Sequence, residues 1–333
     1  MFVSGGSEYV RLLRLQKQAI QTRDRLDTAA QEMTTGLKAS RFEATGGNLT
    51  RLFAIERSLD RNAMYRETLS LTELRIDMAQ ESLGRMLTSV QDVSINLVSA
   101  TGLGDYTAAM SHARAASEAF TDTIAVLNTQ VAGQSLFAGA TTDGKAVADA
   151  ATILADLGTA LAGATTAADA QAAIDDYFAN VFPTSGYLGS TTDLTPVDIG
   201  EGHRLDFALR ADDAKLVAVL KSQAMAAVVS RGLFTGGTDE QMALLASAGA
   251  AMLDAKEGLL DLRGDLGSVQ EAVAKATAAR TAERETLDLA RTAIVTVDPL
   301  EATSAYQQLE VQLEAVYIVT ARIASLRFVN YMS

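Results

Sequence analysis

The 333-residue chain has no cysteine, no tryptophan, two histidines and three prolines. The missing cysteine excludes disulfides, thiolate metal sites, iron–sulfur clusters and cysteine nucleophiles. Two histidines leave few groups for transition-metal binding. The low proline content leaves long helices uninterrupted. Together these absences favour a structural protein over an enzyme.

Positive charge is also scarce, since 28 lysines and arginines stand against 41 acidic residues, a net charge of −13 at pH 7. A chain this acidic attracts polyanions poorly, so we expect no nucleic-acid partner. The longest apolar runs, such as Ala224–Val229, are far shorter than the about 20 residues that cross a bilayer. Residues 1–9 are polar and lack the apolar region of a signal peptide. We therefore expect neither a membrane partner nor a Sec-type leader.

Apolar residues recur along four segments with alternating spacings of three and four residues. This spacing places a narrow apolar stripe along one side of a helix, as in coiled coils. The stripes are Leu12, Leu15, Ala19, Thr22, Leu26, Ala29 and Met33; Ile76, Ala79, Leu83, Met86, Val90, Val93 and Leu97; Leu245, Ala248, Met252, Ala255, Leu259, Leu262, Leu266, Val269, Val273 and Ala276; and Ala302, Tyr306, Leu309, Leu313, Val316, Thr320 and Ile323. Long amphipathic helices are therefore predicted to dominate the fold.

Turn-forming residues mark the ends of these helices. Glycines at 36, 46 and 47 separate the first helix from a second that starts near Asn48 or Leu49. Residues 101–104 end the second helix, and a third is expected from about Tyr106 to Val131. Residues 298–301, Asp-Pro-Leu-Glu, have an N-cap acid, a proline at the first helical position and a capping-box acid, which predicts the start of the last helix.

The middle of the chain has a different pattern. Residues 195–199 and 205–209 alternate apolar and polar around a glycine-containing turn, which predicts a β-hairpin. An alanine-rich tract at 146–180 and residues 212–230 predict helices. Residues 133–240 carry six basic and fourteen acidic side chains, a balance of −8, whereas residues 1–66 carry eleven and seven, a balance of +4. We expect the acidic middle to be a solvent-facing module.

The predicted fold is mainly α, with long coiled-coil-like helices from both chain ends packed together and a small α+β insert domain in the middle. The predicted parts are an N-terminal assembly helix (1–47), the N-terminal arm of a helical core domain (48–132), the central insert (133–238), the C-terminal arm of the core (239–297) and a C-terminal assembly helix (298–333). The terminal stripes have no globular core to bury against. They are therefore either partners of each other or sticky surfaces for neighbouring copies.

One short motif is typical of an enzyme. Gly139–Lys145 has the pattern G-x-x-x-x-G-K of a phosphate-binding loop. Ala146 stands where that loop needs a serine or threonine to bind magnesium, and the preceding residues do not predict a buried strand. A nucleotide-binding enzyme is thus a remote alternative, and a plain loop is the favoured interpretation.

Few other residues are suited to catalysis or metal binding. His112 and His203 are about ninety residues apart, and the chain has no G-x-S-x-G pentapeptide for a serine hydrolase. The acid pairs Asp175–Asp176 and Asp212–Asp213 offer ligands for a hard cation, but acids of this kind are usually solvated. We predict no catalytic residues, no metal site and no cofactor.

Several short segments occur in an order that is found in a known family. They are Gln31–Ala39, Leu136–Gly144, Arg263–Gln270, Asp298–Leu309 and Ser325–Met332. They resemble the corresponding segments of the bacterial flagellin superfamily, and most closely those of hook-associated protein 3, the hook–filament junction family. Two features differ: Glu43–Asn48 replace the family's paired acids, and the family's Pro-Phe is missing at Lys145–Ala146.

The resemblance implies a non-enzymatic structural subunit that serves motility. It implies export through the flagellar type III apparatus to an extracellular position at the hook–filament junction. The implied partners are neighbouring copies of the chain, hook-associated protein 1, flagellin and an export chaperone on the C-terminal helix; a filament-forming flagellin is the alternative. Together with the terminal stripes, it predicts an assembly interface of Leu12, Leu15, Ala19, Leu26, Met33, Tyr306, Leu309, Leu313, Val316, Ile323, Leu326 and Phe328.

Overall fold

The computed structural model describes residues 4–207 and 209–332. The fold is mainly α, with long helices from both chain ends packed together and short strands in the middle, as predicted. The chain divides into two compact units, one of residues 1–63 and 281–333 and the other of residues 64–280. The divisions fall inside two long helices, α3 (Thr50–Gly102) and α8 (Thr238–Val295), whereas the predicted domain boundaries lie near helix ends.

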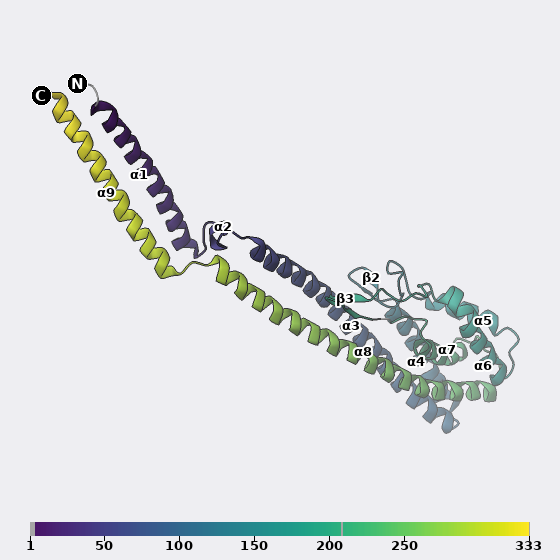
Figure 1. Cartoon of the computed structure of the whole chain (residues 1–333). Coiled ribbons are helices and arrows are strands. Elements are labelled where there is room, and N and C mark those ends of the chain that lie inside the picture. The colour runs from purple at the N-terminus through teal and green to yellow at the C-terminus, as the bar shows by residue number, and fades with distance from the viewer. Residues whose placement is uncertain (1–3, 208, 333) are drawn as a thin grey trace. The chain divides into compact units, whose positions relative to one another are not determined.

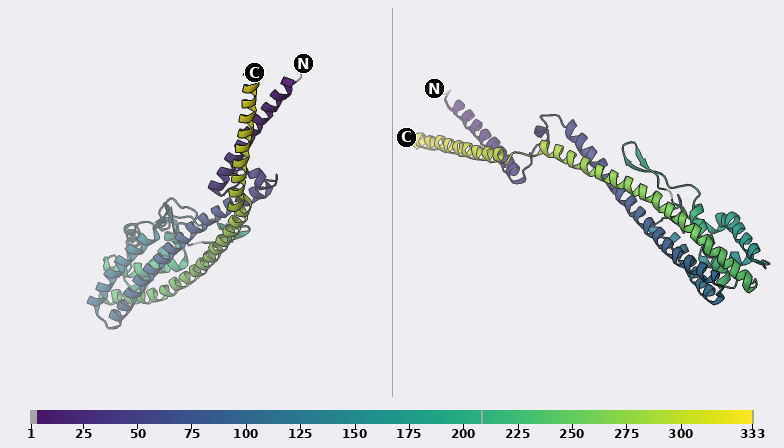
Figure 2. Two further views of the ribbon diagram at one scale, coloured as in Figure 1. Left: turned by 90° about the vertical axis from the view of Figure 1, so that its left-hand side faces the viewer. Right: turned by 90° about the horizontal axis from the view of Figure 1, so that it is seen from below.

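The first unit, residues 1–63 and 281–333, is built around the terminal helices α1 (Ser4–Thr35) and α9 (Pro299–Met332). These helices run antiparallel and pack against each other (Figure 1), and they stay side by side in both views of Figure 2. The short helix α2 (Arg41–Ala44), the beginning of α3 and the end of α8 complete the unit. The predicted cap of α9 is confirmed, since Asp298 Oδ1 accepts a hydrogen bond from the Leu300 N–H at 2.8 Å.

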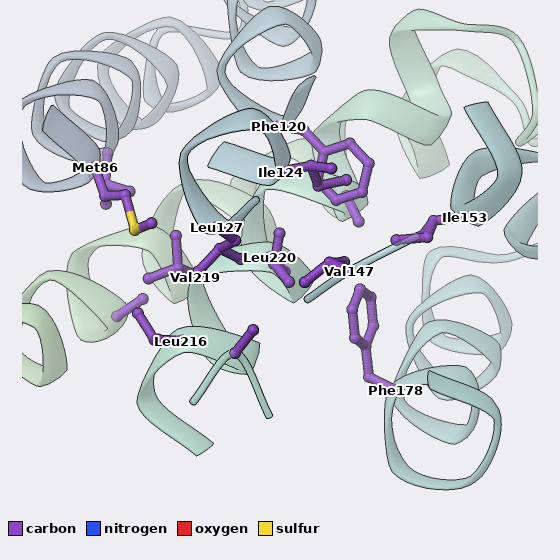
Figure 3. Close-up of a cluster of buried hydrophobic side chains, with 14 of the residues drawn as sticks. Met86, Phe120, Ile124, Leu127, Val147, Ile153, Phe178, Leu216, Val219 and Leu220 are labelled. Atoms are coloured by element: carbon purple, nitrogen blue, oxygen red, sulfur yellow. The ribbon is translucent and has the colours of Figure 1, made fainter. Parts of the chain in front are cut away.

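The second unit, residues 64–280, is a helical bundle with a large buried core. Its parts of α3 and α8 run antiparallel, and Gln80 and Arg263 join them through two hydrogen bonds, of 3.0 and 3.2 Å. Helices α4 (Tyr106–Leu127) and α7 (Ala214–Ser230) pack against each other. Figure 3 shows part of the core, with Met86, Phe120, Ile124, Leu216, Val219 and Leu220.

Short elements fill the middle of the second unit. They are the hairpin of β1 (Gln130–Val131) and β2 (Gln134–Ser135), helices α5 (Ala150–Ala160) and α6 (Ala167–Asp176), the π-helix η1 (Tyr177–Gly186), and the hairpin of β3 (Val197–Gly200) and β4 (His203–Leu205). The second hairpin confirms that a hairpin forms here, but its second strand is residues 203–205 and not the predicted 205–209. Aromatic rings of η1 pack against one another inside this unit, and the Tyr177 and Phe178 rings meet edge to face with their centroids 5.3 Å apart.

Two predicted helices end earlier than expected. The third helix stops at Leu127 instead of Val131, because the Asn128 side chain exchanges two 2.9 Å hydrogen bonds with the Val147 backbone, and the residues that follow form the first hairpin. The tract at 146–180 is also not one helix. It breaks between α5 and α6, where Gly163 adopts a φ of +103° that continues neither helix.

Candidate assembly surfaces

One face of each terminal helix is buried against the other helix. Thr22 and Ala29 on α1 are about as buried as Ala302 and Val316 on α9, all below 8% exposure. The half-buried residues of the same stripes are Leu12, Leu15, Ala19 and Leu26 on α1 and Tyr306, Leu309, Leu313 and Ile323 on α9. We call this contact the seam. The two terminal stripes are therefore partners of each other within one chain.

The predicted interface includes one residue outside the seam and two whose side chains the structure does not describe. Met33 is 43% exposed near the end of α1. The side chains of Leu326 and Phe328 lie outside the described part of the chain. The structure thus brings most of the predicted interface residues together, but inside a single copy.

Backbone hydrogen bonds fix the base of the helix pair. The Lys38 N–H donates to the Val295 carbonyl at 2.8 Å, and the Val297 N–H donates to the Gly36 carbonyl at 3.0 Å. These bonds form an antiparallel bridge between Leu37 and Thr296. Gly36 ends α1 with a φ of +68°, a left-handed conformation that glycine adopts without strain. The segment that follows α1 is therefore paired with the segment that precedes α9, and this pairing sets the register of α1 against α9.

A second set of large apolar side chains faces away from the seam on α1. Val10, Leu13 and Ile20 are exposed, and Ile20 reaches 63%. Their spacing of three and then seven residues puts them on one line along the helix, with the exposed Lys17 between them. We call Val10, Leu13, Lys17 and Ile20 the outer strip of α1.

Helix α9 has a matching strip on its side away from α1. Val311 is 65% exposed and Ile318 is 57% exposed, seven residues apart on the same line, and the exposed Glu314 lies between them. We call Val311, Glu314 and Ile318 the outer strip of α9; Tyr317 is also exposed beside it. Large apolar side chains that are exposed along one line of a helix make that line a candidate interaction surface.

The sequence analysis missed both outer strips. It followed a single apolar stripe on each helix, and a charged residue interrupts each second stripe. The signal that could have found them is a second repeat of spacing three and four, at 10, 13, 17 and 20 and at 311, 314 and 318, displaced to the opposite side of the helix.

The loop at Gly139–Lys145 lacks the geometry of a phosphate site. Gly139 has a φ of +63°, and a β-carbon there would lie 2.6 Å from the Ser190 carbonyl oxygen and 2.7 Å from that of Thr192. Phosphate binds to N–H donors, whereas carbonyl oxygens repel it. Lys145 forms an ion pair with Asp149 at 2.7 Å. The interpretation of this segment as a plain loop is confirmed.

The acid pairs have structural partners. Asp175 pairs with Lys221 at 2.9 Å, Asp212 accepts a 2.8 Å hydrogen bond from Arg210, and Asp213 caps α7 by accepting the Lys215 N–H at 2.8 Å. Residues 4–207 and 209–332 contain no cluster of three acidic or histidine side chains suited to a metal ion. Within the same ranges, no helix combines the length and the apolar character that a membrane span requires.

The terminal helices form a pair whose base is held by backbone hydrogen bonds, and residues 64–280 form a helical bundle with short elements in its middle. Residues 250–332 match the family model for the bacterial flagellin C-terminal helical region. This match covers α9 and much of α8, and it confirms the resemblance to the flagellin superfamily over the C-terminal arm.

Two solved structures are similar to this chain. FlgL from Bacillus cereus is 13% identical with a TM-score of 0.52, and the match covers 72% of this chain and 100% of that one. A structure assigned as a flagellar hook-associated protein from Vibrio parahaemolyticus is 13% identical with a TM-score of 0.49, covering 72% of this chain and 94% of that one. No curated protein sequence matches this chain significantly. The match to the Bacillus cereus structure shows that the chain has an FlgL-like fold.

Proposed function

We propose that this chain is a structural adaptor of the bacterial flagellum that joins the hook to the filament. The FlgL-like fold and the flagellin C-terminal region support this role. The observation that carries it is the terminal helix pair, whose stripes are closed in the seam while further apolar strips remain exposed on its outer faces. Such a pair is ready to pack against neighbours as soon as it forms.

The partners in this role are neighbouring copies of the chain, hook-associated protein 1 on the hook side and flagellin on the filament side. The predicted interface residues act in it by holding α1 and α9 together, because only a closed seam presents the two outer strips in a fixed arrangement. The role needs no cofactor and no chemistry.

Secretion fits the same role. We propose that the chain leaves the cell through the flagellar type III apparatus and that an export chaperone covers α9 beforehand. The chaperone would cover Val311 and Ile318, because exposed apolar side chains on a free subunit promote premature association.

A filament-forming flagellin is the second candidate, because the matching family model describes the C-terminal region of flagellins. Immunogold electron microscopy of the intact source bacterium separates the two. Label at one point between hook and filament supports the adaptor, and label along the filament supports the flagellin. An appendage without label contradicts both.

A further inference from the structure

We propose that residues 64–280 bind an acidic sugar, a hydroxyl-rich molecule with a carboxylate or phosphate group, in two adjoining hollows on α3. The first hollow lies between α3 and α4 and has a volume of about 420 Å³. The second lies between α3 and α8 and has a volume of about 730 Å³. Arg85 and Ser89 line both hollows, so one ligand can occupy the two together. This binding is separate from the assembly role proposed above.

Helix α3 positions the residues that belong to both hollows. Side chains four residues apart lie one above another along a helix, so Arg85 and Ser89 form one line that continues from Glu81. Beside this line is Gly84, whose missing side chain leaves the floor of the second hollow open. A β-carbon at Gly84 would lie 4.0 Å from Cζ of Arg263, which places that guanidinium group over Gly84 from the side of α8.

The first hollow contains hydroxyl groups that have no partner in the chain. Thr123 is only 2% exposed, and within residues 4–207 and 209–332 its hydroxyl forms no hydrogen bond, although its oxygen is open to the hollow. The hydroxyl of half-buried Ser89 is also without a partner in these ranges. The exposed Asp122 adds two carboxylate oxygens that accept hydrogen bonds. Because an unpartnered buried hydroxyl is unfavourable, this hollow favours a ligand body with several hydroxyl groups.

The second hollow supplies positive charge. Arg263 donates a hydrogen bond from Nε to Gln80 Oε1 at 3.2 Å and forms no ion pair with any residue that the structure describes. Arg85 Nε lies 3.9 Å from the Glu81 carboxylate, which is a long ion pair. Two guanidinium groups therefore share one carboxylate, and their terminal nitrogens are available as donors. Such groups bind a carboxylate or a phosphate through charge-assisted hydrogen bonds.

Saturation-transfer difference NMR of the purified full-length chain tests the site. The probes are glucuronic acid, which carries a carboxylate, and glucose 6-phosphate, with neutral glucose as the control, each at millimolar concentration. A signal from either anion supports the site, and the stronger of the two identifies the acidic group that it selects. A glucose signal as strong as that of the anions, or no signal from any of the three, overturns the proposal.

Charge removal locates the bound anion. Arg85→Gln and Arg263→Gln should each weaken binding of the better probe about tenfold, because each removes a charge-assisted hydrogen bond. Arg114→Gln removes an exposed arginine of α4 that lines neither hollow and should leave binding unchanged. Gly84→Leu should abolish binding by filling the second hollow from its floor, whereas Gly84→Ala should retain it. Circular dichroism checks that each variant is folded, and binding that survives in both folded arginine variants overturns the proposal.

Thr123→Val tests the contact with the ligand body. Valine has nearly the same shape as threonine but no hydroxyl, so the variant should bind the better probe severalfold more weakly. Its thermal unfolding temperature should be equal or higher, because the free chain no longer holds an unpartnered hydroxyl. A severalfold loss of binding without a loss of stability supports the proposal. Unchanged binding overturns the assignment of the first hollow to the ligand.

Discussion

The two units of this chain distribute charge and apolar surface in opposite ways. Residues 1–63 and 281–333 contain fourteen basic and fourteen acidic residues, whereas residues 64–280 contain fourteen basic and twenty-seven acidic residues and carry the whole net charge of −13. Residues 64–280, which we call the acidic unit, enclose a broad core in which side chains such as Phe120 and Phe137 are fully buried. Residues 1–63 and 281–333, which we call the terminal unit, bury only the narrow seam between α1 and α9 and leave the two outer strips exposed.

This difference suggests that one unit provides the stability of the folded chain and the other provides the surface for assembly. A bundle with a large core is stable on its own, and its negative charge keeps it soluble and discourages self-association. A pair of helices joined by one stripe gains little from its own burial and gains more from neighbours. The terminal unit is therefore the part whose order should depend on assembly, and the following experiments act on one unit at a time.

The largest effect is expected from deleting residues 297–333, which removes α9. The shortened chain should lose incorporation into the appendage entirely, because both the seam and one outer strip disappear. The cooperative thermal unfolding of the acidic unit should remain, as followed by circular dichroism. A shortened chain that still assembles would show that the terminal unit is not the assembly surface.

Gly139→Ala should destabilise the acidic unit by roughly 3–5 kcal/mol. The alanine combines an unfavourable φ of +63° with a β-carbon that meets two carbonyl oxygens, at 2.6 and 2.7 Å. Gly133→Ala is the matched control, because Gly133 also has a positive φ but no atom within 4 Å, so it should cost only about 1 kcal/mol. Chemical denaturation of the two variants measures the difference, and equal losses would exclude the carbonyl contacts as its cause.

The sequence was informative where one physical rule dominates. The 3–4 stripes at Leu12–Met33 and Ala302–Ile323 predicted the terminal helices, and Asp298 predicted the start of α9, because burial periodicity and capping are local. The break after Leu127 was not predictable in the same way. It depends on Asn128 meeting the backbone of Val147, a contact that the helical pattern of the segment does not reveal.

The candidate site shows the same limit. The sequence indicated which residues form the stripes, but it left open whether the stripes bind each other or a neighbouring copy. The answer depends on which face remains exposed after the helices pair, which is a property of the folded chain. Once Leu313 and its neighbours are in the seam, Val311 and Ile318 become the free surface.

Leu313→Asp and Val311→Asp test the two faces of α9 against each other. Leu313 is half-buried in the seam, so its replacement should weaken the helix pair by about 2–3 kcal/mol by placing a charge in an apolar contact. Val311 is exposed on the outer strip, so the same replacement should leave the pair intact and reduce assembly only. Hydrogen exchange of α1 and α9 in the free subunit measures pairing. Equal exchange in the two variants would remove the distinction between seam and outer strip.

The smallest effect is an alkaline transition confined to the acidic unit. Burial, reinforced by the charge of Asp156, raises the pKa of Tyr177 to about 12 from the ordinary value of 10.0. Because the folded pKa lies above the unfolded one, this phenol contributes its full stability below pH 10 and loses it as the pH rises toward 12. The free energy of unfolding of residues 64–280 should therefore fall by about 1–2 kcal/mol across this range. Tyr177→Phe should flatten that part of the fall, measured by denaturant unfolding at each pH, and a slope unchanged by the substitution would assign the transition to another group.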